Sequence, residues 1–71
     1  MSKKSEQQND KGFKCFRFAM ARLGFNKESI IDNLPDYLDG VSSEQLAKMS
    51  IREIYFTYKF ECETWIEENL V

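Results

Sequence analysis

Side chains that commonly catalyse reactions or bind metals are few in this sequence. Histidine is absent, so the usual general base near neutral pH and the usual activator of a Cys or Ser nucleophile are missing. Asp32, Asp36 and Asp39 are close in sequence, but their spacing differs from that of a calcium-binding hand. The three glycines are scattered, so no glycine-rich loop could hold a phosphate. The sequence therefore predicts a protein without catalytic activity, cofactor or metal.

The cysteine content and the absence of long apolar segments suggest a cellular location. Cys15 and Cys62 are far apart and have no histidine with which to form a zinc site. We expect both to be reduced, buried thiols, with a disulfide as the alternative. The sequence contains neither a secretory signal nor a run long enough to cross a membrane. We therefore expect a cytoplasmic protein without a membrane partner.

Charge is distributed unevenly along the chain. Residues 1–27 contain seven basic and two acidic residues, which gives +5, whereas residues 28–71 contain three basic and ten acidic residues, which gives −7. The total of −2 therefore hides a strong separation of charge. Such a separation indicates a molecule that binds a charged partner or associates with itself.

The length of 71 residues allows one domain with a small core. Six Phe, three Tyr and one Trp are too many for a disordered chain, although a core of this size leaves only a few kcal/mol of stability. Oligomerisation or binding to a larger partner is therefore expected. We predict a disordered polar tail at residues 1–11 and a single helical domain at residues 12–71.

Helix signals follow one another from Gly12 onward and predict an all-α bundle of four or five short helices. Gly24 is suited to the C-terminal cap of a helix over residues 12–23, where alternation of Phe16, Phe18 and Met20 leaves a strand as the weaker alternative. Asn26 is suited to cap a helix that ends near residue 33, and a further short helix is expected over residues 35–39.

Two capping boxes predict the remaining helices. Ser42 with Gln45 begins a helix over residues 43–49, and Ser50 with Glu53 begins another. Because no Gly or Pro follows Ser50, we expect the last helix to continue to about residue 69 and to be the longest. The predicted core contains twelve residues: Phe13, Phe16, Met20, Leu23, Ile30, Leu34, Leu46, Ile54, Tyr58, Cys62, Trp65 and Ile66.

The outer face of the last helix is the main candidate site. A helical projection places two Phe residues one turn apart among carboxylates, and the candidate partner-binding residues are Glu53, Phe56, Phe60, Glu63 and Glu67. The pair would anchor a partner protein while the carboxylates attract a basic surface. The predicted function is that of a small regulator, inhibitor or adaptor. In a more specific version of this prediction, the acidic face occupies a nucleic-acid channel on the partner protein and blocks it, as small phage-type or plasmid-type inhibitors can.

Nucleic-acid binding is the alternative function. The first predicted helix carries basic residues with one aromatic residue among them, and the candidate residues are Lys11, Lys14, Arg17, Phe18 and Arg22. Cations at this spacing could follow a phosphate backbone while the Phe18 ring stacks on a base.

The segment from Ala19 to Ile30 has small residues, then Leu23 and Gly24, then a polar stretch that leads to Ile30. It resembles the middle of a helix-turn-helix, and the resemblance implies a nucleic-acid-binding segment at residues 19–34, with its recognition helix beginning near Asn26. The Leu-Gly-Phe sequence before a helix also resembles ubiquitin-associated domains. A plain C-terminal cap at Gly24 is the third interpretation.

The basic and acidic faces could also meet each other. Within one chain, Phe18 would then pack near Phe56 and Phe60, with the surrounding charges paired. Between two chains, the basic helix of one would bind the acidic helix of the other in a symmetric dimer.

Overall fold

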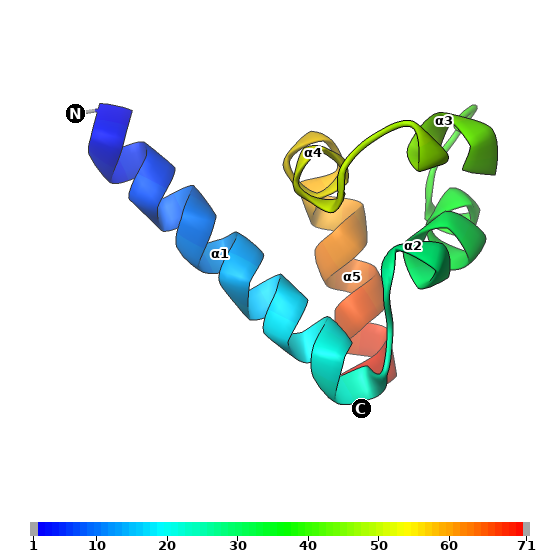
Figure 1. Ribbon diagram of the computed structural model, residues 1–71, viewed down its shortest axis with the longest axis horizontal. Coiled ribbons are helices and arrows are strands. Elements are labelled where there is room, and N and C mark those ends of the chain that lie inside the picture. Colours follow the sequence, from blue (N-terminus) through cyan, green and yellow to red (C-terminus); the bar gives the residue numbers. More distant parts are fainter. Residues whose placement is uncertain (1, 71) are drawn as a thin grey trace.

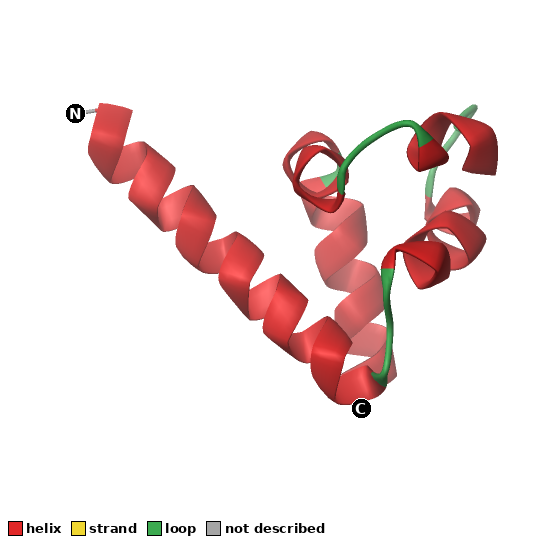
Figure 2. Cartoon of the chain, viewed as in Figure 1, coloured by secondary structure: helices red, strands yellow, loops and turns green. Residues whose placement is uncertain are grey.

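The computed structural model describes the backbone of residues 2–70 and the side chains of residues 11–70. Within that part, the chain forms five α-helices and one short 3-10 helix and has no strand, so the all-α class is confirmed (Figures 1 and 2). The elements are α1 (Ser2–Leu23), α2 (Lys27–Asn33), η1 (Leu34–Tyr37), α3 (Ser43–Ala47), α4 (Ile51–Thr57) and α5 (Lys59–Leu70).

Helix α1 is the longest element, and it begins about ten residues earlier than the sequence predicted. Residues 2–11, expected to form a polar tail, continue the helix away from the other elements, as Figure 1 shows. These residues contain no Gly or Pro, and Lys, Glu and Gln favour helices. Residue 1 lies outside the described residues, and the division into a tail and a domain stays a prediction.

The turn after α1 has the predicted glycine cap. Gly24 adopts φ +75°, a value that L side chains rarely adopt. The Phe25 N–H donates to the Met20 carbonyl over 2.8 Å, which closes the last turn of the helix. The next residue, Asn26, caps α2 as predicted by accepting the Ser29 N–H. The chain thus reverses between α1 and α2 within three residues.

The expected long C-terminal helix is interrupted at Tyr58, and this part of the prediction is wrong. Tyr58 has φ −123° and ψ 49°, outside the helical region, so α4 and α5 are separate helices. Their axes differ in direction, since Figure 1 shows α4 nearly end-on where α5 runs downward. No Gly or Pro marks the interruption, and helical bonds continue from Tyr58 N–H to Ile54 and from Cys62 N–H to Tyr58. Tyr55, just before the interruption, is buried in the core.

The core lies between α1, the α4–α5 pair and the group formed by α2, η1 and α3. Ten of the twelve predicted core residues are buried, and Leu23 and Tyr58 are only half-buried. Tyr55 takes the place of Tyr58, and its ring centroid lies 5.6 Å from that of Phe13 and 5.0 Å from that of Phe16. The Phe25 ring stacks on Trp65 at 5.1 Å, which joins the turn after α1 to α5.

Candidate functional site

The two phenylalanines of the predicted acidic face do not form an exposed pair. Phe56 is half-buried, and its ring centroid lies 5.8 Å from that of Phe13 on α1. The guanidinium of Arg52 lies 5.0 Å from the Phe56 ring and 5.4 Å from the Phe13 ring. Phe60, beyond the interruption at Tyr58, is 76% exposed. Phe60 is therefore available to a partner, whereas Phe56 contributes to packing between α4 and α1.

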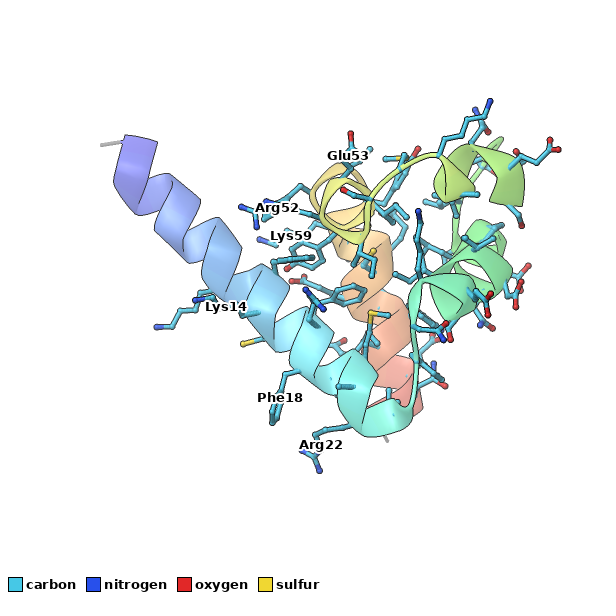
Figure 3. The ribbon with its side chains drawn as sticks, in the orientation of Figure 1. Lys14, Phe18, Arg22, Arg52, Glu53 and Lys59 are labelled. Carbon is cyan, nitrogen blue, oxygen red and sulfur yellow. The ribbon has the colours of Figure 1, made fainter. Side chains whose placement is uncertain are left out.

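Two of the predicted partner-binding carboxylates form hydrogen bonds within the fold. Glu53 accepts the Ser50 N–H over 2.9 Å and thereby completes the cap of α4. In Figure 3 its side chain points away from α1. Glu63 accepts the Tyr55 hydroxyl over 2.8 Å. Burial of Tyr55 and this hydrogen bond raise the pKa of its hydroxyl above its ordinary value.

The predicted basic residues lie together on the outer side of α1. Lys11, Lys14, Arg17, Phe18 and Arg22 are all exposed, and Phe18 is exposed to 68%. Figure 3 shows Lys14, Phe18 and Arg22 directed away from the rest of the molecule. We call the row of Lys14, Phe18 and Arg22 the basic ridge. Phe18 does not meet Phe56 within the chain, because Phe13 occupies that position, so the intrachain pairing of the two faces is wrong.

A second ridge runs along α5 beside the first. Phe60, Glu63 and Glu67 are three and four residues apart, so they share one face of the helix, and we call this row the acidic ridge. All three side chains are exposed. Since α1 packs directly on α5, the two ridges of opposite charge lie on neighbouring helices.

A groove with two hollows separates the ridges. The acidic hollow, of about 360 Å³, is lined by Gly12, Cys15, Phe16, Ala19, Glu63, Ile66, Glu67 and Leu70. The basic hollow, also about 360 Å³, is lined by Lys14, Cys15, Phe18, Ala19, Arg22 and Leu70. Cys15, Ala19 and Leu70 line both hollows and thus form the middle of the groove. Its floor is apolar and its sides carry opposite charges.

The cysteines differ from each other in this structure. Cys62 is buried as predicted, and burial raises its pKa to about 12. Cys15 is exposed in the groove, so the prediction that it is buried is wrong. Both are free thiols. A helical projection places Cys15 at the edge of the apolar arc of α1, and edge positions are less completely covered than central ones.

Arg52 is a site residue that was not predicted from the sequence. A further hollow of about 500 Å³ is lined by Phe13, Lys14, Arg17, Phe18 and Arg52, on the flank of α1 away from the groove. Figure 3 shows Arg52 and Lys59 directed toward α1 from α4 and α5. Two of the three basic residues in the acidic half of the sequence thus join the basic residues of α1. The spacing of Arg52 and Phe56, four residues apart, was the available sign of this contact.

The segment that resembles a helix-turn-helix forms two helices, but α2 is poorly suited to contact DNA. It has only seven residues, and the Lys27 ammonium donates to the Ala47 carbonyl over 3.0 Å. Glu28 and Asp32 on α2 are exposed and would repel phosphates. Six of the ten basic residues are on α1, whereas the candidate recognition helix carries one, Lys27.

Comparison with known protein families, with curated proteins and with solved structures found no match for this chain. No helix among the described residues is long and apolar enough to cross a membrane. The fold and the surface therefore define the class: an all-α protein with two oppositely charged ridges on either side of an apolar groove.

Proposed function

We propose that this protein is a small non-enzymatic regulator, inhibitor or adaptor that binds another protein through the α1–α5 face. That face consists of the basic ridge, the acidic ridge and the groove between them. One observation carries the proposal. Among residues 11–70, the large apolar side chains that remain exposed are Phe18, Phe60 and Leu70, and all three are on α1 or α5. Exposed aromatic side chains bordered by charges are typical of protein-binding surfaces.

The mixture of charges favours a protein over a nucleic acid as the partner on this face. A phosphate backbone that crossed the groove would be attracted by Lys14 and Arg22 but repelled by Glu63 and Glu67. A protein surface can carry acidic and basic groups in the matching order. The anchors in this proposal are Phe18 and Phe60, and the original anchor Phe56 is replaced because Phe13 and Arg52 cover it.

Capture of binding proteins by immobilised wild type and variants tests this function. Phe18→Ala combined with Phe60→Ala should abolish capture of a specific partner without loss of the fold, because both side chains are exposed and contribute little to the core. The matched control is Glu44→Ala combined with Lys48→Ala, two exposed positions on and beside α3. Quantitative mass spectrometry should show the same partner on wild type and control. Equal capture by all three proteins would contradict the proposal.

Binding of single-stranded nucleic acid is the second candidate, favoured by the hollow that Lys14, Arg17, Phe18 and Arg52 line. Three cations around an exposed aromatic ring have the chemistry of a base-stacking site. If this candidate holds, Arg17→Ala with Arg22→Ala should weaken binding of a fluorescent oligonucleotide and reduce its dependence on salt, while Lys48→Ala should not. The absence of binding by wild type at low salt would exclude it.

A further inference from the structure

We infer that the partner that fits the α1–α5 face is a second copy of this chain, bound in a symmetric dimer with its axis at the middle of the groove. The inference rests on the proposed function, because it uses the same face and names the protein that binds there. It extends the function by assigning the partner, whose surface is then the same α1–α5 face described above.

The order of charges across the face is self-complementary. Lys14 and Arg22 lie on one side of Cys15, Ala19 and Leu70, and Glu63 and Glu67 lie on the other. A two-fold axis that runs along the groove, in the plane between two facing copies, places the basic ridge of each copy over the acidic ridge of the other. In such an interface, a contact from residue i to residue j is repeated from j to i. Every attractive contact between ridges is therefore formed twice.

The shapes of the two sides are also reciprocal. Phe18 projects from the basic ridge and is 68% exposed, whereas the acidic hollow has apolar walls that include Ala19, Ile66 and Leu70. In the dimer, Phe18 of each copy enters the acidic hollow of the other. Lys14 and Arg22 then approach the carboxylates at the rim of that hollow. An aromatic side chain buries roughly 150–250 Å² in all, and Phe18, exposed to 68%, can lose at most about two thirds of such an area in each copy.

Dimerisation also explains why Phe18 and Leu70 are exposed in so short a chain. A core in a domain of about 70 residues provides only a few kcal/mol, and small domains often gain stability by association. Phe18 and Leu70 are exposed in the single chain, at 68% and 52%. Both lie at the middle or the edge of the same groove, so one interface would cover both.

Charge exchange between the ridges tests the dimer. The basic-ridge variant is Lys14→Glu with Arg22→Glu, and the acidic-ridge variant is Glu67→Lys; Glu63 is left intact because it accepts the Tyr55 hydroxyl. Sedimentation from micromolar to near-millimolar concentration should show a wild-type dimer. Each variant alone should dissociate about tenfold more readily or worse, because like charges then face each other. An equimolar mixture of the two variants should regain a dimer, since opposite charges are restored at the contact.

Two controls separate this result from loss of the fold. Glu44→Lys with Lys48→Glu exchanges charges beside α3, and this variant should dimerise as wild type does. A short bismaleimide should link two copies through Cys15, which lies at the proposed axis, whereas buried Cys62 should not react and Cys15→Ser should give no linked product. Circular dichroism of each variant should retain the helical signal.

A wild type that stays monomeric to near-millimolar concentration would overturn the inference, as would ridge variants that dimerise equally well. If the monomer nevertheless captures a different protein through Phe18 and Phe60, the proposed function stands without self-association. If capture is also insensitive to Phe18→Ala with Phe60→Ala, the proposed function fails as well. The two failures are therefore distinguished by separate measurements.

Discussion

Gly12 and Tyr55 show how closely α1 approaches α4. A Cβ atom added at Gly12 would lie 2.8 Å from the Tyr55 hydroxyl oxygen, and Tyr55 is fully buried between Phe13 and Phe16. Gly12→Ala should gain about 1 kcal/mol of helix propensity but lose about 1–3 kcal/mol through overcrowding. We predict a net loss in the free energy of unfolding, measured by urea denaturation.

The Tyr55→Phe background provides the control for that substitution. Tyr55→Phe alone should cost about 1 kcal/mol, because the hydrogen bond to Glu63 is lost. The next Tyr55 atom is 3.8 Å from the added Cβ, an ordinary contact, so Gly12→Ala should become stabilising in this background. If Gly12→Ala destabilises both backgrounds equally, the hydroxyl is not the source of the crowding.

Alkaline pH should destabilise the fold, because the buried Cys62 thiol and Tyr55 hydroxyl lose their protons more readily in the unfolded state. Burial raises the pKa of Cys62 from 9.0 to about 12, so the folded state holds this proton after the unfolded state has released it. The stabilisation is complete below pH 9 and is lost as pH rises from 9 to 12; the raised pKa of Tyr55 acts in the same direction. Urea denaturation at several pH values should show this fall. Cys62→Ala should make it shallower.

Residue exposure could be predicted where a residue lies at the centre of a helical face. Phe16 lies near the centre of the apolar arc of α1, and it is buried as predicted. Which of Tyr55 and Tyr58 is more deeply buried could not be predicted, because the helical projection assumed one straight helix through both. Phe56 was assigned to solvent for the same reason, and its contact with Phe13 depends on where α1 crosses α4.

At the scale of the element, Ser50 and Glu53 fix the start of α4. Ser50→Ala should cost about 1 kcal/mol of stability, because its hydroxyl accepts the Glu53 N–H. Glu53→Ala should also destabilise, whereas Glu53→Gln keeps a side-chain oxygen for the Ser50 N–H and should be nearly neutral. Thermal unfolding measures these differences. A Glu53→Ala variant that is fully stable but fails to bind a partner would instead support the original assignment of Glu53 to the interface.

The starts of α3 and α4 were predictable and the interruption at Tyr58 was not, for a physical reason. A capping box involves residues within one turn of each other, so Ser42 with Gln45 and Ser50 with Glu53 are visible in the sequence. The conformation of Tyr58 has no local signal and accompanies the packing of α4 and α5 on α1. The acidic ridge therefore begins at Phe60 rather than at Glu53.

At the scale of the whole molecule, the first part of α1 should be dispensable for folding. Figure 1 shows this part extending beyond the other helices, and the first described α1 side chain in the core is Phe13. A chain that begins at residue 10 should unfold cooperatively, with a free energy of unfolding within about 0.5 kcal/mol of the full chain. Calorimetry of both chains measures this. A large loss would show that residues 2–9 belong to the folded domain and would contradict the predicted boundary at residue 11.

The separation of charge along the sequence becomes a separation across one face. The sequence indicates a basic N-terminal part and an acidic C-terminal part, but not that α1 packs directly beside α5. That contact places Lys14 and Arg22 across a groove from Glu67, while the packing of α4 on α1 brings Arg52 toward α1. Contacts between residues fifty positions apart depend on the whole fold. The residues of the two ridges could therefore be identified from the sequence, but their positions on either side of one groove could not.

The stacking of Phe25 on Trp65 gives the protein an internal optical reporter. Trp65 is the single tryptophan, and its ring lies parallel to that of Phe25, with an interplanar angle of 2°. The pair connects residues forty positions apart, so it forms only when the turn after α1 has docked on α5. The emission of Trp65 during refolding thus reports the closure of this long loop, while far-ultraviolet dichroism follows the helices themselves. A delay between the two signals would time the docking step directly.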